Sequence, residues 1–428
     1  AAAPRAKPPR PDAVFDALQE GMTALESGNF PLSLSLLRGV ARVAPDHPGV
    51  LFQLARAEAA AGHRNRAFAA LEKSARVGFA SRASSEPHLR SFSSEPRFTR
   101  VLTRVAANLS PVPAGGEFVA LAEKDLIPEG TAWDPALPRL FVSSLYKRKI
   151  VEVGANGAAR DFVAAAGGGI WQVLGMKVDA PRNRLLACSA ADPQMIGFEE
   201  QDRGRSGLFA FDLRDGRLLS RYAVGPDPAR HLFNDLAVTR HGDVYVTDSE
   251  EGSVYRLDAA ADRLERFLPA GTFAYPNGIA LSPDERYLYV ASFSGVDRVD
   301  LFSRVRVALP HSRDVTLAGI DGLICMGDAL IAVQNGVLPQ RIARFELSRR
   351  FDSVVGHSIL ERLDACVTDP TTGVPAGDEF LFIANAQIRS FDEKGKIFPE
   401  EKLESVRILK VPLRPPAKAE APLRTAAE

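Results

Sequence analysis

A short phrase recurs six times between Glu129 and Asn385. Each copy begins with a polar or small residue near a glycine, crosses a short apolar stretch, turns, and returns along a second apolar stretch that ends in Ser or Asn. The copies read PEGTAWDPALPRLFVSS, VLGMKVDAPRNRLLACS, FNDLAVTRHGDVYVTDS, YPNGIALSPDERYLYVAS, IDGLICMGDALIAVQN and TTGVPAGDEFLFIAN. Their leading residues, Glu129, Leu174, Asn234, Asn277, Asp321 and Thr372, are separated by 45, 60, 43, 44 and 51 residues. Repetition near this period, with two strands in each copy, predicts a six-bladed β-propeller.

The propeller is predicted to span residues 117–413, because third and fourth strands follow most copies of the phrase. The last copy is followed by RILKVPL and then has no fourth strand. The segment EFVALA (117–122) precedes the first copy and has no other partner. We therefore expect this segment to complete the sixth blade, which closes the ring and removes an exposed edge. The last residues, 414–428, are predicted to be a disordered tail.

A second repeat, with a period of 34 residues, occupies the first part of the chain. Gly28 and Gly62, and likewise Leu37 and Leu71, recur at this spacing, and Gly21 is matched by Ala55. Helical hairpins with small residues at these places are typical of tetratricopeptide (TPR) repeats. We expect helices at about 13–27, 31–43, 48–61, 64–77 and 96–108.

The predicted domain order follows from these two repeats. Residues 1–12 are a flexible lead, 13–109 a TPR-like helical domain, and 110–116 a Pro- and Gly-rich linker before the propeller. Two repeat units are fewer than the three usually needed for stability, so the fifth helix and the propeller wall are expected to pack against them. Such a module is either a docked cap or a groove for a protein partner.

Charge and composition exclude several classes of protein. The chain has 53 basic and 53 acidic side chains, so no strong field favours nucleic acid or an anionic membrane. No apolar run approaches the roughly 18 residues of a membrane-spanning helix. The three cysteines, Cys188, Cys325 and Cys366, have neither metal-site nor disulfide-scaffold spacing. The opening AAAPRAKPPRP lacks Met, which favours an exported bacterial protein, periplasmic or secreted, over a cytoplasmic one.

The register of the repeat predicts a metal site. In a propeller the first strand of each blade lines the central channel, so the six leading residues are expected to ring one opening, which we call the top. Glu129, Asn234, Asn277 and Asp321 bring two carboxylates and two amide oxygens to it. Such a ligand set favours Ca²⁺ over Mg²⁺, and Thr372 or water completes the shell. The alternative is that Asn-Gly and Asp-Gly pairs mark turns.

The phrases PEGTAWD, FNDLAV…YVTDS, YPNGIALSPDERYLYVAS and IDGL resemble the senescence-marker-protein/gluconolactonase/luciferin-regenerating-enzyme family, over residues from about 117 to 413. The chain is more distantly similar to paraoxonases and strictosidine-synthase-like proteins. The resemblance implies a six-bladed propeller whose channel holds a divalent cation, usually Ca²⁺, with Mg²⁺, Mn²⁺ or Zn²⁺ as alternatives. Its ligands would be Glu129, Asn234, Asn277 and Asp321.

The chemistry that the resemblance implies is hydrolysis of a lactone or related ester. The cation would polarise the carbonyl, and Asp321 or His231 would activate water. The chain departs from the paraoxonase pattern at Leu174, where those proteins carry His before Gly. The alternative function is a non-catalytic metal-containing propeller that captures a ligand or acts as a scaffold, with the TPR module recruiting a partner. A third alternative, carbon–carbon bond formation, requires a Glu base for which no candidate is found.

Several other residues are expected near the top opening. Trp171, Phe233, Tyr275 and Phe293, with Thr372, form either an apolar substrate wall or packing contacts. The long connections Ala190–Ser206 and Ala386–Ser405 are candidate lids. Asp235, next to a predicted ligand, is either a hydrogen-bonded carboxylate at a strand start or a ligand of a second cation.

Overall fold

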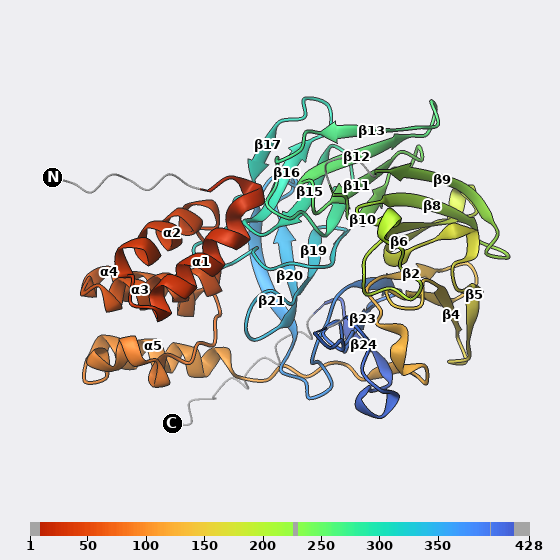
Figure 1. Cartoon of the computed structure of the whole chain (residues 1–428). Helices are drawn as coiled ribbons and strands as arrows, with labels where there is room; N and C mark the ends of the chain where they lie inside the picture. Colours follow the sequence, from red (N-terminus) through yellow and green to blue (C-terminus); the bar gives the residue numbers. More distant parts are fainter. Residues whose placement is uncertain (1–8, 226–229, 394, 415–428) are drawn as a thin grey trace, which may run out of the picture.

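The computed structural model describes residues 9–225, 230–393 and 395–414, in which a helical region is followed by six four-stranded sheets arranged in a ring. Figure 1 shows the helices on one side of this ring, against the sheets that contain β15–β21. The predicted order of a helical region and a six-bladed propeller is thus confirmed. Most of the predicted lead (1–12) and tail (414–428) lies outside the described residues.

The helical region contains five α-helices in paired contact, as the 34-residue period predicts. They are α1 (Val14–Glu26), α2 (Phe30–Val43), α3 (Pro48–Ala60), α4 (Arg64–Arg76) and α5 (Pro96–Asn108). Gly28 and Gly62 adopt φ of 79° and 74° in the turns of the two hairpins, a conformation that favours glycine. At position 21 a Cβ would lie 3.0 Å from Leu37, so the missing side chain lets α1 and α2 approach closely. Assignment as a TPR module remains a prediction.

The extra packing that two hairpins need comes from α5 and from the propeller. Phe68 of α4 stacks on Phe92 with ring centres 4.6 Å apart, and α5 adds Phe98 to the same cluster. The backbone N–H of Ala80 donates to the Leu338 carbonyl at 2.8 Å, and the Thr316 hydroxyl donates to the Asp46 carbonyl at 2.7 Å. The helical region therefore rests on loops of the propeller.

Each blade is an antiparallel sheet whose strands follow the sequence outward from the channel. Blade 1 holds β2 (Thr131–Asp134), β3 (Arg139–Ser143), β4 (Ile150–Gly154) and β5 (Ala159–Val163). Blade 2 holds β6 (Gln172–Asp179), β7 (Arg184–Ala190), β8 (Ser206–Asp212) and β9 (Leu218–Val224). Blade 3 holds β10 (Phe233–Val238), β11 (Val244–Asp248), β12 (Ser253–Asp258) and β13 (Arg263–Leu268).

The second half of the ring repeats this plan. Blade 4 holds β14 (Ile279–Leu281), β15 (Tyr287–Ser292), β16 (Gly295–Asp300) and β17 (Arg306–Ala308). Blade 5 holds β18 (Leu323–Met326), β19 (Ala329–Gln334), β20 (Arg341–Leu347) and β21 (Val354–Arg362). Blade 6 holds β22 (Gly373–Ala376), β23 (Glu379–Ile383) and β24 (Val406–Pro412), and its outermost strand is β1 (Glu117–Leu121).

The ring closes as predicted, because the strand that precedes blade 1 pairs with the end of the chain. β1 runs antiparallel to β24, with Val119 opposite Ile408 and Leu121 opposite Val406. Through this pairing blade 6 has strands from both ends of the propeller sequence. The closure satisfies a sheet edge that would otherwise be exposed.

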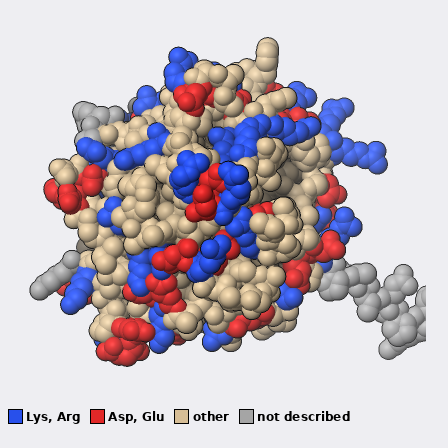
Figure 2. All heavy atoms as spheres, turned by 90° about the vertical axis from the view of Figure 1, so that its right-hand side faces the viewer, with Lys and Arg blue, Asp and Glu red and all other residues tan. Residues whose placement is uncertain are grey.

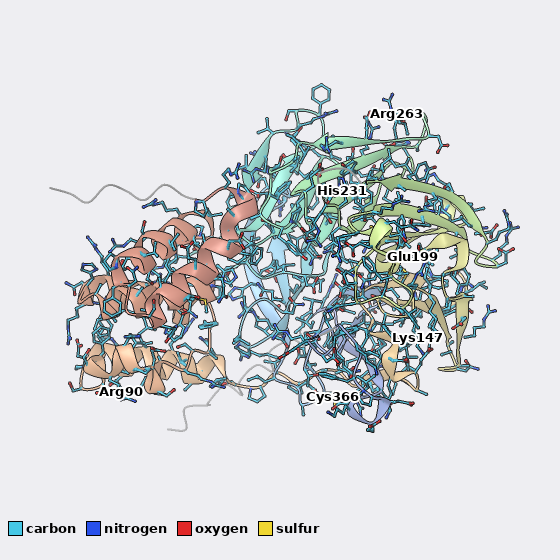
Figure 3. The ribbon with its side chains drawn as sticks, in the orientation of Figure 1. Arg90, Lys147, Glu199, His231, Arg263 and Cys366 are labelled. Carbon is cyan, nitrogen blue, oxygen red and sulfur yellow. The ribbon has the colours of Figure 1, made fainter. Side chains whose placement is uncertain are left out.

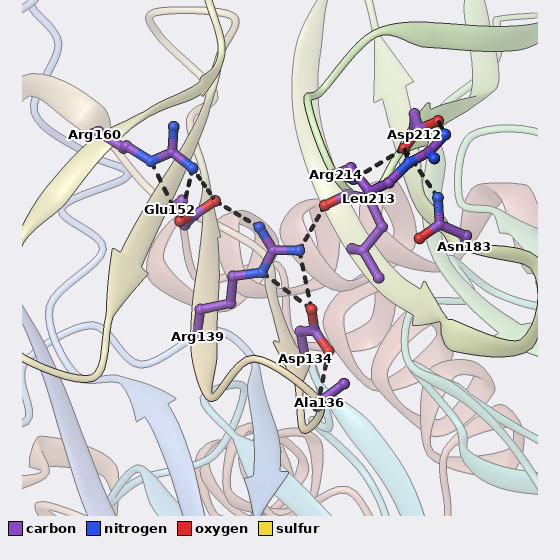
Figure 4. A network of polar contacts seen from close by, with 9 residues as sticks. All are labelled: Asp134, Ala136, Arg139, Glu152, Arg160, Asn183, Asp212, Leu213 and Arg214. Carbon is purple, nitrogen blue, oxygen red and sulfur yellow. Dashed lines mark hydrogen bonds and ion pairs between the residues drawn. The ribbon is translucent and has the colours of Figure 1, made fainter.

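Apolar side chains fill each of the six gaps between neighbouring blades, and a polar network adds to one of them. Arg139 is buried between blades 1 and 2, where it donates to Asp134 at 3.0 Å, Glu152 at 2.9 Å and the Leu213 carbonyl at 2.5 Å. Figure 4 shows this arginine bridging the two blades, with Arg160 on the far side of Glu152. Buried charges thus tie blade 1 to the blade 2 backbone.

The outer surface has no large region of a single charge on the face seen in Figure 2, where basic and acidic side chains are intermixed. This agrees with the equal numbers of the two charge types in the sequence. Within the described residues, no helix is long and apolar enough to cross a membrane.

Candidate metal centre

The predicted ring residues lie just before or at the start of the first strands. The glycines that follow them allow neighbouring blades to pack closely. A Cβ at Gly130 would lie 2.0 Å from the Leu174 carbonyl oxygen, and one at Gly278 would lie 2.4 Å from that of Asp321. Both glycines have φ outside the left-handed region. Glycine therefore allows the backbones of adjacent blades to meet around the channel.

The alternative that these Asn-Gly and Asp-Gly pairs are turns is wrong for blades 4 and 5. The Asn277 N–H donates to the Ala291 carbonyl at 2.9 Å, and the Ala291 N–H donates back to the Gly278 carbonyl at the same distance. The Asp321 N–H likewise donates to the Val333 carbonyl at 2.9 Å. The backbones of these residues therefore pair with the second strand of their blade.

The residues that end the second strands hold the starts of the first strands. Trp171 N–H donates to the hydroxyl of Ser189 at 2.9 Å, and the Asn234 side-chain amide donates to the hydroxyl of Ser249 at 3.0 Å. In blade 5, the amide of Asn335 donates both to the Asp321 carboxylate at 2.5 Å and to the Pro370 carbonyl at 3.0 Å. The recurring Ser and Asn of the phrase therefore order the top of the channel.

Glu129, Asn277 and Asp321 form the centre of the candidate site. The Asn277 Nδ2 donates to Asp321 Oδ1 at 2.7 Å, which leaves the amide oxygen of Asn277 without a partner. The hydroxyls of Thr371 and Thr372 donate to the Glu129 backbone carbonyl at 3.0 and 2.7 Å and fix that residue. Glu129 Oε2 and Asn277 Oδ1 are both shielded from solvent and have no hydrogen-bond partner among the described residues.

The electrostatics of the centre are those of several carboxylates held together. Burial, and after it the charges of Asp321, Asp369 and Asp235, raise the pKa of Glu129 well above its ordinary value. Burial also raises the pKa of Asp321, against the hydrogen bonds from Asn335 and Asn277. A low-dielectric site with mutually repelling carboxylates favours a bound cation.

Asp369 and Asn335 are two members of this site that sequence reasoning did not assign to it. Asp369 precedes β22 and accepts a hydrogen bond from the Ile388 N–H at 2.9 Å, and its charge raises the pKa of Glu129. It stands three residues before Thr372, the offset that His231 has from Asn234. This shared offset is the sequence signal that could have identified Asp369. Asn335 was predicted only as the residue that ends a second strand.

The remaining leading residues, Leu174, Asn234 and Thr372, are all buried. Leu174 is 5% exposed and packs in the cluster between blades 2 and 3, so the leading residue of blade 2 provides no side-chain oxygen. Asn234 is buried beside Ser249. Asp235 accepts a hydrogen bond from the Leu236 N–H at 2.8 Å and lies 3.9 Å from Lys177 Nζ. Its contacts agree with a hydrogen-bonded carboxylate at a strand start.

His231 is held within blade 3 by groups of the second and third strands. Its Nδ1 lies 2.6 Å from Asp248 Oδ2, and its ring meets that of Tyr255 edge-on. Asp248 and Glu251 could join His231 as metal ligands by distance, but Glu251 already forms an ion pair with Arg266. Figure 3 labels His231 among the strands of the propeller. Its backbone N–H also donates to the Gly204 carbonyl in the β7–β8 connection of blade 2 at 3.2 Å.

The four aromatic residues expected at the top divide into two pairs. Trp171 and Phe233 are 4% and 0% exposed and belong to the clusters between blades, which agrees with packing. Tyr275 is 40% exposed, and partial burial, then the charges of Glu250, Asp321 and Glu129, raise the pKa of its hydroxyl. Phe293 packs on Phe15 of α1 and stacks on His47.

The rim of the channel is built from distant parts of the chain. Phe15 of α1 lies 5.6 Å from Tyr275, ring centre to ring centre, so the helical region borders the rim at blade 4. The two long connections meet near blade 1: the Ile196 N–H donates to the Tyr146 carbonyl at 2.9 Å, and Phe391 contacts the Tyr146 ring. The expectation that these connections act as lids remains a prediction.

The opposite end of the channel is apolar. A cavity of about 560 Å³ there is lined by the far ends of the first strands, including Trp133, Leu281 and Met326. The channel narrows between this cavity and the candidate metal centre to a space of about 10 Å³ beside Asp235. The candidate oxygen donors are thus separated from this cavity by the constriction.

The donor set fits a hard divalent cation. Glu129, Asn277 and Asp321 offer carboxylate and amide oxygens, two of them without a partner, and no His or Cys is among these donors. Oxygen donors of this kind suit Ca²⁺, which accepts six to eight ligands in flexible geometry. Asn234, Asp369 and water are available to complete the shell.

One family model matches part of the propeller region. Residues 127–302 match the family model described as the SMP-30/Gluconolactonase/LRE-like region. This segment runs from β2 to β16 and contains Glu129, Asn234 and Asn277, but it ends before Asp321. The comparison with curated proteins gave no match.

Three solved structures to which this chain is similar are a gluconolactonase, a calcium-binding protein and a luciferin-regenerating enzyme. A gluconolactonase from Xanthomonas campestris is 20% identical, with 71% of this chain and 98% of that one covered and a TM-score of 0.47. The calcium-binding protein regucalcin from Agrobacterium tumefaciens is 16% identical, with 72% and 98% covered and a TM-score of 0.48. A luciferin-regenerating enzyme is 16% identical, with 71% and 95% covered and a TM-score of 0.47.

Proposed function

We propose that this protein is a divalent-metal-dependent hydrolase of lactones or related esters, with Ca²⁺ as the preferred ion. The observation that carries the proposal is the pair of solvent-shielded, unpartnered oxygens, Glu129 Oε2 and Asn277 Oδ1, beside the Asp321 carboxylate. Unpaired buried oxygens next to a carboxylate are costly unless a cation binds them. The family match over residues 127–302, which includes gluconolactonases by name, supports the class of reaction.

The chemistry assigns separate tasks to the residues of the site. Glu129, Asn277 and Asp321 would hold a divalent cation, which would supply polarisation of the substrate carbonyl and stabilisation of the developing oxyanion. Asp321 accepts a proton from water as the water oxygen attacks the carbonyl carbon. The bond between the carbonyl carbon and the ring oxygen then breaks, and Asp321 returns the proton to the leaving oxygen. Asn277 and Asn335 hold the carboxylate in place.

The test begins with the metal content of the full chain purified without chelator. Turnover on a panel of sugar lactones and aryl esters is then measured with and without added Ca²⁺, and with Mg²⁺, Mn²⁺ and Zn²⁺. Asp321→Ala and Asn277→Ala are expected to lower kcat/KM by about 100-fold or more. Asn156→Ala, in an exposed turn of blade 1, is the control and should leave turnover unchanged. Unchanged hydrolysis in both site variants would refute the assignment.

The alternative function is a metal-containing propeller without catalysis, which captures a ligand or acts as a scaffold. The apolar Leu174, which adds no polar group from blade 2, favours it. Bound metal in the wild type without turnover on any lactone or ester would support this alternative over hydrolysis.

A further inference from the structure

Four arginine side chains line a cavity of about 190 Å³ between the helical region and blade 5. Arg76 at the end of α4 and Arg104 of α5 line it from one side, and Arg341 of β20 and Arg362 of β21 from the other. Asp314 is the only carboxylate among the described lining residues. Four guanidinium groups and one carboxylate give the lining a formal net charge of +3.

Arg341 is the most buried of these cations and has only neutral partners. Its side chain belongs to a residue 5% exposed, its Nε donates to Gln334 Oε1 at 2.7 Å, and its Nη1 lies 3.5 Å from the Gly78 carbonyl oxygen. No ion pair joins it to any described carboxylate. A Cβ at Gly78 would lie 2.4 Å from Nη1, so the backbone of the helical region leaves room for this guanidinium.

The other three arginines are also weakly compensated. Arg76 Nε lies 3.7 Å from Asp314 Oδ1 and has no hydrogen-bond partner among the described residues. Arg104 donates to the Arg76 carbonyl at 3.4 Å, and Arg362 donates to the Ser110 carbonyl at 2.9 Å. Apart from one long ion pair, the contacts of this cluster are therefore with neutral acceptors.

The cations also act on one another. Burial, and after it the charge of Arg362, lower the pKa of Arg341 to about 10, which leaves it charged at neutral pH. Partial burial and then Arg341 lower the pKa of His357, at the edge of the cavity, below its ordinary value. Like charges held in a partly desolvated space are costly unless an anion shares it.

We propose that this cavity is a binding site for a phosphate-type oxyanion, either free phosphate or the phosphoryl group of a small phosphoester. A tetrahedral dianion accepts several hydrogen bonds at once, and arginine forks match its oxygen pairs. The cavity volume is about six times the share of liquid volume that one water occupies, enough for a phosphoryl group and a few further atoms. Because the arginines come from both parts of the chain, the anion holds the helical region to blade 5.

The proposal is tested by calorimetric titration of the full chain as purified, with no calcium added, using inorganic phosphate and glycerol 3-phosphate. Sodium chloride of equal ionic strength serves as the blank. Arg104→Gln removes an exposed cavity arginine, and Arg341→Gln removes the buried one. Arg100→Gln is the matched control, since this exposed arginine lies on α5 four residues earlier and outside the cavity lining.

We expect saturable binding to the wild type, weakened about tenfold or more by Arg104→Gln and lost with Arg341→Gln, while Arg100→Gln binds like the wild type. Tighter binding of glycerol 3-phosphate identifies a phosphoester site, and tighter binding of inorganic phosphate identifies a free-phosphate site. The absence of saturable binding for both compounds would overturn the proposal. So would an equal loss in Arg100→Gln and Arg104→Gln, because the effect would then come from diffuse charge. Arg104→Gln keeps the test decisive if Arg341→Gln fails to fold.

Discussion

Calcium should stabilise this protein through the two oxygens that have no partner in its channel. Glu129 Oε2 and Asn277 Oδ1 are shielded from solvent, and neither oxygen accepts a hydrogen bond from a described residue. An unsatisfied buried polar group costs about 1–3 kcal/mol, and a charged one costs more. For these two atoms together we expect about 4 kcal/mol, which is the stabilisation that a ligand gives at about 1,000 times its Kd.

The expected change in melting temperature follows from this free energy. In large domains 1 kcal/mol corresponds to about 2 °C, so saturating Ca²⁺ should raise the Tm of EGTA-treated protein by about 8 °C. The measurement is a calorimetric scan of the full chain with EGTA, with Ca²⁺ and with Mg²⁺ at equal ionic strength. The linkage relation further requires that the Tm rise with the free calcium concentration.

The variant Glu129→Gln distinguishes calcium binding by the Glu129 carboxylate from a general effect of charge on stability. This variant removes a carboxylate whose pKa is raised by burial and by Asp321, so the metal-free variant should be more stable than the metal-free wild type. It should also lose most of the calcium-dependent shift. Glu250→Gln, at an exposed position near the rim, is the control and should keep the shift. A calcium shift of the same size in Glu129→Gln, or a wild-type Tm that no divalent ion changes, would refute the reasoning.

Three further outcomes are expected. Gly278→Ala would place a Cβ 2.4 Å from the Asp321 carbonyl oxygen. It should therefore lower the free energy of unfolding in urea by about 2 kcal/mol or more and weaken calcium binding. Wild-type stability and calcium affinity in this variant would contradict the close-packing role of Gly278. Burial raises the pKa of Glu361 to about 7 from 4.5, so its stabilising effect is fully present below pH 4.5 and lost as the pH rises through 7. Relative to wild type, Glu361→Gln should therefore gain about 3 kcal/mol between about pH 4 and pH 8, and the exposed Glu346→Gln should show no such gain. Arg139→Met leaves the buried Asp134 without its ion-pair partner and Glu152 with Arg160 alone, so it should cost about 3 kcal/mol in urea unfolding. A cost below about 1 kcal/mol would mean that the network is dispensable.

Local patterns predicted the elements well because each blade and each helical hairpin is a short-range unit. The repeated strand phrase located the first two strands of every blade, and the unpaired segment 117–122 predicted the closing strand. Gly21 lies at a close contact between two helices, and Gly28 lies in a tight turn. The 34-residue period was enough to predict both positions. Such features depend on contacts between residues that are at most a few tens of positions apart, so a repeat in the sequence can reveal them.

The candidate site could be predicted only in part from the sequence, because its geometry depends on how the blades pack against one another. Register alone brought Glu129, Asn277 and Asp321 into consideration, but it did not show which oxygens lack partners. Asp369 stands outside the repeated phrase and joins the centre only when the ring closes. Trp171 and Phe233 were open to two interpretations, and only packing between blades shows that they are buried.

The sequence by itself determined the order of helices and blades and predicted the oxygen donors at the heads of blades 1, 3, 4 and 5, since both follow from periods that repeat along the chain. Only the tertiary structure decided which donors are free to bind a cation and where charges far apart in sequence gather. Arg76, Arg104, Arg341 and Arg362 share no pattern, and they meet because the helical region rests on blade 5. Contacts of that kind depend on the docking of two separately encoded surfaces, and no local period records them.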